Sequence, residues 1–267
     1  ISTRDWSSDV CSSDLIVLVM PAYNAEKTLE KTYREIPPQV VDDILLVDDE
    51  STDQTVARAD GLGIRVIRHE RNRGYGGNQK TCYDNALEMG ADIVIMLHPD
   101  YQYTPRLVQA MVSPIAFGVF DCMLGSRILS NGALAGGMPL YKYVANRLLT
   151  LFQNIFLGSK LSEFHTRLRA YSREVLQSIP YHDNSEDFAF DSQFLCQILY
   201  ARFRVGEITC PTRYAADSSS ISFRNSVRYG LAVLRTTLDS VLHTLGWRKN
   251  ALFAPLDHLR AANSRQD

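Results

Sequence analysis

The chain of 267 residues lacks several features that would place it in a specialised class. Its five cysteines are scattered, odd in number and without Cys-x-x-Cys spacing, which argues against a zinc site or a disulfide framework and fits a reducing cytoplasm. It has no apolar run of the roughly 20 residues that a membrane-spanning helix needs. Its formal net charge of -2 gives no general attraction to nucleic acid. The remaining composition, with 45% hydrophobic and 22% charged residues, is that of an ordinary globular protein.

The first fourteen residues differ from the rest of the chain. Residues 1–14 are rich in Ser and Asp, and they have neither the basic nor the apolar region of a signal peptide. The stretch from Asp5 to Leu15 resembles a translated sequencing adapter. We therefore expect residues 1–14 to be a non-native or disordered leader, residues 15–222 to form one large domain, and residues 223–267 to form a C-terminal amphipathic helix and tail.

From residue 15 onward, segments typical of buried strands alternate with segments typical of helices. This alternation predicts an α/β fold with a mostly parallel sheet that is covered by helices on both faces. The expected strands are 15–20, 44–47, 64–68, 93–97, 121–126, 168–171 and 204–209; the expected helices are 25–36, 53–60, 75–89, 105–117, 139–157, 188–200 and 223–245.

Acidic residues follow two of these expected strands directly. Asp48 and Asp49 follow the second strand, and Asp100 follows the fourth. Ligands of open α/β sheets bind beyond the carboxyl ends of the strands, where a carboxylate can hold a ribose hydroxyl or a divalent cation. A simpler alternative for the first cluster is a helix N-cap at Ser51 or Thr52. Two acidic strand ends in one domain favour a nucleotide site.

Five short segments, taken in their order along the chain, form a recognisable set. They are Pro21-Ala22-Tyr23-Asn24, Val47-Asp48-Asp49-Glu50-Ser51-Thr52-Asp53, Asn72-Arg73-Gly74-Tyr75-Gly76-Gly77, His98-Pro99-Asp100-Tyr101-Gln102 and Gly125-Ser126-Arg127. The set resembles the family-2 glycosyltransferases of the GT-A fold, and it is most similar to the dolichyl- and polyprenyl-phosphate sugar transferases. The resemblance covers about residues 16–214. It implies a Rossmann-like GT-A domain that takes a sugar from a nucleoside diphosphate.

The resemblance assigns the nucleoside end of the donor pocket to the first two segments. Pro21, Tyr23 and Asn24 would line the nucleobase, and Asp48 and Asp49 would take the base and the ribose, for which a carboxylate is a suitable acceptor. A turn that ends the first strand is an equally good explanation of the first segment.

The sugar-diphosphate end would be formed further along the chain. Asn72, Gly74 and Gly76 would lie near the diphosphate, where backbone amides can face an anion. A flexible turn would need the same glycines. Arg169 and Arg213 would contact phosphate by analogy, although Arg169 as a solvated surface residue is a comparable alternative.

A divalent cation, Mg²⁺ or Mn²⁺, is implied by the fourth segment. The resembling enzymes bind metal and diphosphate with Asp-x-Asp, often followed by x-Gln, whereas here the first Asp is replaced by His98. Asp100 and Gln102 stand as expected, so the implied metal ligands are Asp100, Gln102 and His98. Because Mg²⁺ prefers oxygen ligands, His98 has two alternatives, a hydrogen bond to ribose or phosphate and a partner in the neighbouring backbone. A second departure is Arg167, which replaces a turn glycine.

The acceptor decides which groups catalyse an inverting transfer. A saccharide hydroxyl needs a carboxylate to take its proton, and Asp187 and Asp191 are the candidates. A lipid monophosphate is already ionised near neutrality and needs cations instead, which Arg127 and Arg169 would supply. Asp100 would act through the leaving diphosphate in either case.

The expected function is transfer of a sugar from a GDP- or UDP-linked donor to a polyprenyl or dolichyl phosphate. The alternatives are transfer to a saccharide hydroxyl, a non-catalytic sugar-nucleotide binder and a sugar-1-phosphate nucleotidyltransferase; the last would need a Gly-rich basic loop after the first strand. The expected helices 139–157 and 223–245 carry apolar stripes with flanking arginines. They would lie either on the inner face of the cell membrane or against the protein's own core. We expect a cytoplasmic protein that is either soluble or peripheral on that membrane.

Overall fold

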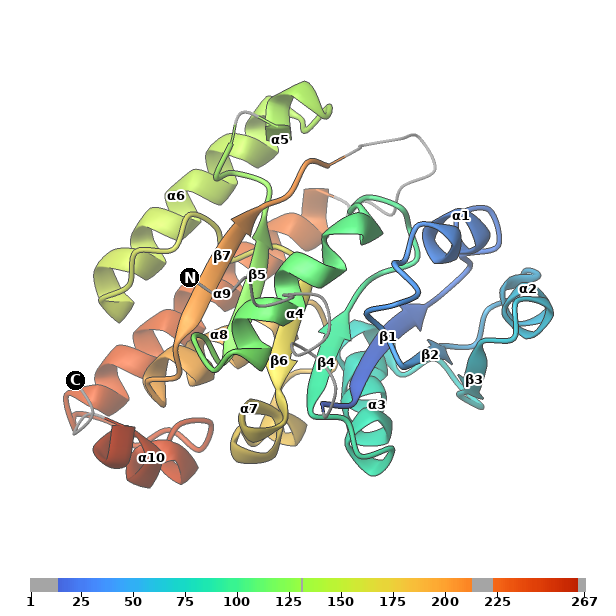
Figure 1. Ribbon diagram of the computed structural model, residues 1–267. Helices are drawn as coiled ribbons and strands as arrows, with labels where there is room; N and C mark the ends of the chain where they lie inside the picture. The colour runs from blue at the N-terminus through green and yellow to red at the C-terminus, as the bar shows by residue number, and fades with distance from the viewer. Residues whose placement is uncertain (1–13, 131, 213–222, 264–267) are drawn as a thin grey trace, which may run out of the picture.

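The computed structural model describes residues 14–130, 132–212 and 223–263. Its centre is one seven-stranded sheet with the order β3-β2-β1-β4-β6-β5-β7 (Figure 1). β6 runs antiparallel to both of its neighbours and every other pair is parallel, which confirms the expected mostly parallel sheet. The strands are β1 (Ile16–Ala22), β2 (Asp43–Asp48), β3 (Arg65–Arg68), β4 (Ile93–Met96), β5 (Cys122–Ser126), β6 (Arg169–Ser172) and β7 (Val205–Thr209).

The carboxyl ends of β2, β1 and β4 lie side by side at one edge of the sheet. In the register of the central strand, Ala22 pairs with Asp48 on one side and Val19 pairs with Met96 on the other. The sequence predicted that the first strand ends before Pro21, but β1 continues to Ala22. A proline fits there because the pairing of β1 with β4 has already ended, so that no N–H is needed on that side.

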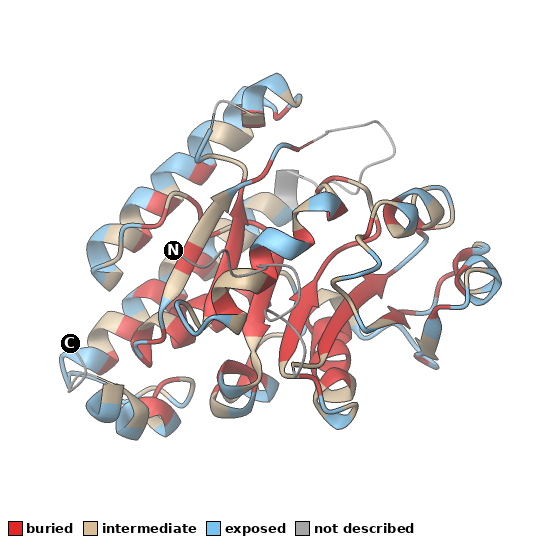
Figure 2. Ribbon diagram, viewed as in Figure 1, coloured by how far each residue is buried: buried red, intermediate tan, exposed pale blue. Residues whose placement is uncertain are grey.

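Helices cover both faces of the sheet because side chains alternate along each strand. Val17 and Val19 point into a core beneath α3 (Gly74–Glu88), α7 (Arg173–Ser178) and α8 (Phe190–Tyr200). Ile16, Leu18 and Met20 point into a second core beneath α1 (Leu29–Arg34), α2 (Thr55–Gly61) and α4 (Val108–Ala116). Figure 2 shows the buried sheet between helices whose outer sides are exposed. The shorter described elements outside these layers are α5 (Gly132–Ala135), η1 (Pro105–Leu107), η2 (Tyr181–Asp183), η3 (Ala254–Leu256) and α10 (Asp257–Asn263).

Several helix boundaries differ from the expected ones. α1 begins at Leu29 rather than at Ala25, since the amide of Ala25 donates to Thr55 Oγ1 at 2.7 Å and holds the preceding turn on α2. The alternative of an N-cap at Ser51 or Thr52 is wrong: α2 begins at Thr55, and Ser51 Oγ accepts from another segment. α7 was not expected, although Ser172 is a regular N-cap that accepts from the amide of Val175.

Two long helices, α6 (Leu140–Leu157) and α9 (Phe223–Thr244), pack against each other outside α8 with their polar sides inward. α6 buries Asn146, Thr150 and Gln153, whereas its Leu148 is 63% exposed and its Ile155 is 67% exposed. α9 follows the same pattern, with Thr236, Thr237 and Ser240 buried and Leu231 63% exposed. Of the two alternatives for these helices, packing of the apolar stripes on the protein's own core is therefore wrong. Within the described ranges, no helix is long and apolar enough to cross a bilayer.

Candidate functional site

The loops after β1 and β2 are joined by hydrogen bonds, which builds the first wall of the site. Asn24, at a left-handed φ of 51°, donates its amide to Ser51 Oγ at 2.8 Å and accepts from the amide of Thr52 at 2.9 Å. Tyr23 is 57% exposed between these loops. Of the three residues expected to line a nucleobase, Tyr23 presents a free ring face, Asn24 organises the loop and Pro21 is buried within β1.

Asp48 lies fully buried at the end of β2 with one oxygen atom available for a further hydrogen bond. Its Oδ2 accepts from the amide of Ser51 at 3.0 Å and lies 3.8 Å from Arg68 Nε. Its Oδ1 is buried, and among the described residues it has no hydrogen-bond partner. Because a buried carboxylate oxygen without a donor is costly, Asp48 has the chemistry to accept an N–H or O–H from a ligand.

Asp49 instead holds the start of α3 against the sheet. Its Oδ1 accepts from the amide of Arg73 at 2.8 Å and lies 2.7 Å from His69 Nδ1, while its Oδ2 accepts from the amide of Gly74 at 3.0 Å. Asn72 supports the same turn, since its Nδ2 donates to the carbonyl of Asp49 and its Oδ1 accepts from Gly74. A carboxylate at a helix N-terminus satisfies amides that the helix leaves unpaired. Both residues were expected to face the donor, yet their side chains build the scaffold beneath it.

The glycines at the start of α3 allow the loop that precedes α8 to approach closely. A Cβ atom on Gly74 would lie 2.8 Å from the carbonyl oxygen of Glu186, and a Cβ atom on Gly76 would overlap the carbonyl oxygen of Ser185. The amide of Gly76 donates to the carbonyl of Glu186 at 2.7 Å, and Lys80 Nζ reaches the Glu186 carboxylate. These amides are satisfied inside the protein. The glycines thus bring α3 and the acidic loop together rather than presenting free amides to an anion.

An aromatic stack joins the end of β4 to α8. The ring of Tyr75 lies parallel to the imidazole of His98, with centroids 5.4 Å apart, and its hydroxyl donates to Asp191 Oδ2 at 2.6 Å. Gln79 donates to the other oxygen of Asp191 at 3.1 Å. Burial and two nearby arginines lower the pKa of His98 well below its ordinary value, so the imidazole is neutral.

The two candidate bases differ in their surroundings. Both oxygens of Asp191 are hydrogen-bonded to neighbouring side chains, and the residue is 7% exposed. Asp187 is exposed, and its Oδ1 accepts from the amide of Phe188, whose ring packs on Tyr75 at 5.0 Å. Asp187 is therefore the candidate that an incoming hydroxyl can reach.

Asp100 pairs with an arginine that sequence reasoning left out of the site. Arg167 Nη1 lies 3.7 Å from Asp100 Oδ2, with the two side chains 19% and 14% exposed. The same guanidinium lies 5.4 Å from the centroid of Tyr75. The amide of Gln102 donates to Asp100 Oδ1 at 3.1 Å. The only signal for Arg167 in the sequence was its replacement of a turn glycine.

The residues expected to hold a cation supply few hard ligands. The described parts of the chain contain no group of three or more His, Cys, Asp and Glu residues that could hold a metal ion. Of the expected set, His98 contributes a neutral imidazole, Gln102 an amide and Asp100 a carboxylate that already carries Arg167 as its counter-ion. The oxygen donors of the set are the carboxylate of Asp100 and the amide oxygen of Gln102, and Mg²⁺ would take its other oxygens from phosphate and water.

Arg169, which was expected either to contact phosphate or to lie solvated on the surface, is fully buried. Its Nε donates to the carbonyl of Thr166 at 2.9 Å, its Nη1 to that of Asp191 at 3.1 Å and its Nη2 to that of Phe164 at 3.1 Å. A guanidinium with all three nitrogens on carbonyl oxygens ties β6 to α8. Arg169 is neither a solvated surface residue nor a group facing phosphate. Arg213, the other expected phosphate contact, lies outside the described residues.

Arg127 is bound to a buried carboxylate, and Lys142 lies in the first turn of α6. Arg127 donates its Nε and its amide to Glu163, each at 2.8 Å. Burial alone would raise the pKa of Glu163, but Arg127 offsets this and the pKa lies below its ordinary value. The pKa of Lys142, in the first turn of α6, is lowered by burial and then by the charges of Arg167 and Arg127.

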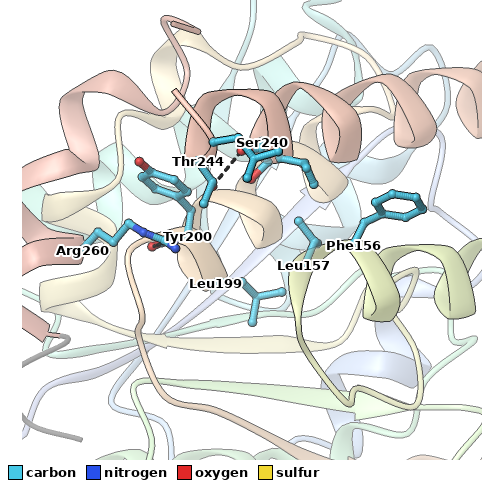
Figure 3. Close-up of a pocket in the computed structure, with 9 residues that line it drawn as sticks. Phe156, Leu157, Leu199, Tyr200, Ser240, Thr244 and Arg260 are labelled. Atoms are coloured by element: carbon cyan, nitrogen blue, oxygen red, sulfur yellow. Dashed lines mark hydrogen bonds between the residues drawn. The ribbon is translucent and has the colours of Figure 1, made fainter. Parts of the chain in front are cut away.

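A cavity of about 200 Å³ lies elsewhere, between α6, α8 and α9 (Figure 3). Phe156, Leu157, Tyr200 and Thr244 contribute to its lining, and Arg260 lies across the ring of Tyr200 at 4.7 Å. None of the candidate site residues described above lines this cavity. It is a gap between packed helices rather than a part of the site.

Comparison with known proteins agrees with the resemblance. The chain is 27% identical over 242 residues to the UDP-N-acetylglucosamine–dolichyl-phosphate N-acetylglucosaminyltransferase of Methanococcus voltae, covering 83% of this chain and 96% of that protein. It is 25% identical over 202 residues to the polyprenol monophosphomannose synthase of Mycolicibacterium smegmatis, with coverage of 72% and 75%.

The fold has a solved counterpart in glucosyl-3-phosphoglycerate synthase from Mycobacterium tuberculosis, crystallised with Mg²⁺ and UDP. The TM-score is 0.67 at 21% identity, with coverage of 86% of this chain and 80% of that one. This likeness confirms the GT-A fold. The family model described as glycosyl transferase family 2 matches residues 17–179, more than half of the chain. The chain is thus a glycosyltransferase that belongs to glycosyl transferase family 2.

Proposed function

We propose that this glycosyltransferase moves a sugar, with inversion, from a nucleoside diphosphate to the phosphate of a polyprenyl or dolichyl lipid. The observation that carries the proposal is that α6 begins with Lys142, whose charge interacts with those of Arg127 and Arg167, and that the outer face of this helix is apolar and exposed. A lipid phosphate needs both features together, because its headgroup is anionic and its chain stays in the bilayer. The names of the two relatives, both of which act with lipid phosphates, support the same acceptor class.

The donor end of the proposal rests on β1 and β2. Tyr23 offers an exposed ring on which a nucleobase can stack, and the unpaired Oδ1 of Asp48 can accept from a base N–H or a ribose hydroxyl. Asp49, Asn72, Gly74 and Gly76 hold these groups in place through α3. Both GDP- and UDP-linked sugars belong to the proposed donor class.

The chemical step is an in-line displacement at the anomeric carbon. An oxygen of the acceptor phosphate forms the new bond, the bond to the donor's diphosphate breaks, and its electron pair leaves with that diphosphate. The acceptor needs no general base, because a phosphate monoester with a second pKa of about 6 is already ionised near neutrality. Lys142, with Arg127 and Arg167 nearby, would hold the acceptor oxygen against the anomeric carbon.

The divalent cation implied by the resemblance would have Asp100 as its protein ligand and the donor's diphosphate oxygens as further ligands. When bound, Mg²⁺ or Mn²⁺ would neutralise the leaving diphosphate. The synthase that shares this fold has been crystallised with UDP and each of these ions, which supports the same use here.

The second candidate acceptor is a saccharide hydroxyl, which would need a base. The exposure of Asp187 beside Phe188 and Tyr75 favours this alternative. It predicts that Asp187→Asn abolishes transfer, whereas a phosphate acceptor predicts transfer within about threefold of wild type, since no proton has to be removed.

The deciding experiment is donor turnover with GDP- and UDP-sugars, with and without a short polyprenyl phosphate. We expect the lipid to stimulate turnover and Lys142→Gln to raise the KM for the lipid by about tenfold, the cost of one charged hydrogen bond. Lys160→Gln is the matched control, because Lys160 is an exposed lysine just beyond the other end of α6. Turnover that is indifferent to the lipid, or a Lys160 variant that loses as much as the Lys142 variant, would count against the proposal.

A further inference from the structure

The C-terminal helix α9 reaches the candidate site with the side chain of Tyr229. The Tyr229 hydroxyl lies 2.7 Å from Nδ1 of His165, and the two rings meet edge to face with their centroids 5.5 Å apart. His165 belongs to the loop before β6, between Glu163 and Arg167. A helix that lies beyond the residues matched by the family model, 17–179, thus contacts a loop within them.

The contact with Tyr229 sets the orientation of the His165 ring. The other ring nitrogen, Nε2, is buried and has no hydrogen-bond partner in the part of the chain that the structure describes. Burial is the main cause that lowers the pKa of His165 to about 4, so the imidazole is neutral near neutrality. Burial also raises the pKa of Tyr229, so its hydroxyl keeps its proton. The two side chains therefore form a neutral, directional hydrogen bond, and its loss would leave the ring without a polar anchor.

The backbone of His165 holds one of the site's arginines. The His165 carbonyl oxygen accepts from Arg127 Nη2 at 2.8 Å, and Glu163 accepts from Arg127 Nε at 2.8 Å. The guanidinium is therefore oriented by a carboxylate and a carbonyl of the same loop. Because the ring and the carbonyl belong to one residue, the hydroxyl that anchors the ring also supports the carbonyl. Support of this kind matters, since displacements of about 1 Å in a binding group can weaken its action severely.

The two sides of α9 have different surroundings at this point. Tyr229 is partly buried, and the charges of Asp191 and of three arginines act on the pKa of its phenol after burial does. Leu231, two residues later, is 63% exposed. Two residues correspond to about 200° of rotation in an α-helix, so these side chains lie on opposite sides. α9 thus turns Tyr229 toward the site while its apolar side faces outward.

We propose that Tyr229 is a positioning residue for the acceptor, and that through His165 it holds Arg127 in the geometry that binds the acceptor's phosphate. The inference rests on the proposed function, in which Arg127 assists Lys142, and it adds α9 to the acceptor end of the site. Tyr229 itself contacts neither substrate in this proposal. Its loss should therefore weaken binding of the lipid phosphate and leave the nucleotide untouched, because β1 and β2 build the donor end.

The test measures the KM for a short polyprenyl phosphate, kcat, and the Kd of UDP and GDP by calorimetry. Tyr229→Phe keeps the ring and should raise the KM for the lipid about fivefold, the usual worth of one neutral hydrogen bond. Its kcat and nucleotide Kd should stay within about twofold of wild type. His165→Leu should have the same effect, and the double variant should lose no more than either single one, because both remove one interaction. His165→Asn places an amide where Nδ1 lies, so it should restore the wild-type KM.

Tyr200→Phe is the matched control. It also removes the hydroxyl of a mostly buried tyrosine, whose partner Asp257 contacts His243 near the other end of α9. A KM for the lipid that is the same in Tyr229→Phe and in this control overturns the inference. It is also overturned if nucleotide affinity falls as much as lipid affinity, since the role of Tyr229 would then be structural alone.

Two further outcomes complete the test. If the double variant raises the KM by the product of the two single effects, the side chains act independently, and the inference is wrong while the proposed function stands. If the wild-type enzyme turns over its donor equally well with and without the lipid, the proposed function is wrong and the inference falls with it. Urea unfolding of each variant shows whether it is folded, and the Asn and Leu variants of His165 decide the question should Tyr229→Phe not fold.

Discussion

The outward apolar face of α6 and α9 predicts binding to a lipid bilayer. Its basic residues include Arg147, Arg228 and Arg235, all exposed, so the face should prefer anionic lipids. The perturbation that tests this is the double substitution Leu148→Ser with Ile155→Ser. Each of these residues follows a buried polar residue, Asn146 or Gln153, by two positions and so lies on the other side of α6. Both side chains point away from the core, which means that folding should be unaffected to within about 0.5 kcal/mol.

The expected magnitude follows from the exposure of the two side chains. Complete burial of a Leu or Ile side chain contributes about 1.5–3 kcal/mol. Leu148 is 63% exposed and Ile155 is 67% exposed, so roughly two thirds of that amount remains to be gained in the bilayer. The double variant should therefore lose about 3 kcal/mol of membrane affinity, or about 100-fold in the partition coefficient.

The assay is flotation with vesicles of phosphatidylcholine and phosphatidylglycerol, at low and high salt. The control is Phe117→Ser with Val119→Ser, since these side chains are 54% and 53% exposed beside α4 on the opposite side of the sheet. Equal vesicle binding by wild type and the α6 variant would refute the reasoning. So would wild-type protein that ignores vesicles but forms a dimer which the α6 variant breaks, because a second copy would then cover this face.

Two further predictions concern stability. The pKa of His165 lies at about 4, lowered by burial and nearby arginines, so only the unfolded chain takes up its proton between that value and about 6.5. The free energy of unfolding should be constant above about pH 6.5 and lower by about 2 kcal/mol near pH 5; urea unfolding of His165→Gln should show a weaker dependence, and an unchanged one would contradict the assignment. Gly76→Ala should lower the free energy of unfolding by about 1–3 kcal/mol, because the new methyl group meets the carbonyl of Ser185. Gly61→Ala has no neighbour within 4 Å and should be neutral; equal effects of the two would rule out the close approach at Gly76.

The central strands β1, β2 and β4 were predictable because each is built on a short apolar run, which is buried whatever its neighbours are. The direction of β6 was not, since residues 168–171 read the same way in a parallel or an antiparallel pair. Side chains at strand ends were predictable as a group but not in their individual roles. Asp48 and Asp49 are adjacent in sequence, yet only the structure separates a carboxylate with an unpaired oxygen from one that caps α3.

The charged groups of the site depended on contacts that the sequence does not display. Arg169 follows Arg167 by two residues, a spacing that would place both on one side of an extended chain, but β6 begins only at Arg169 and carries it beneath α8. Arg167 lies just before the strand and remains near the sheet edge beside Asp100. The replacement of a glycine was the only hint, and a hint of that kind does not state which partner the new side chain meets.

The sequence also did not show which side of α6 and α9 is buried. Their apolar stripes were predictable from helical spacing, but the buried side was decided by polar partners. Asn146 Nδ2 donates to Glu163 Oε1 at 2.8 Å, and this is the carboxylate that holds Arg127. The polar side of α6 thus faces Glu163 and Arg127 because it carries Asn146, which donates to Glu163. The leucines of α6 face outward as a consequence. The proposed lipid-phosphate acceptor would use both sides of such a helix, whereas a saccharide hydroxyl would leave the outer side unexplained.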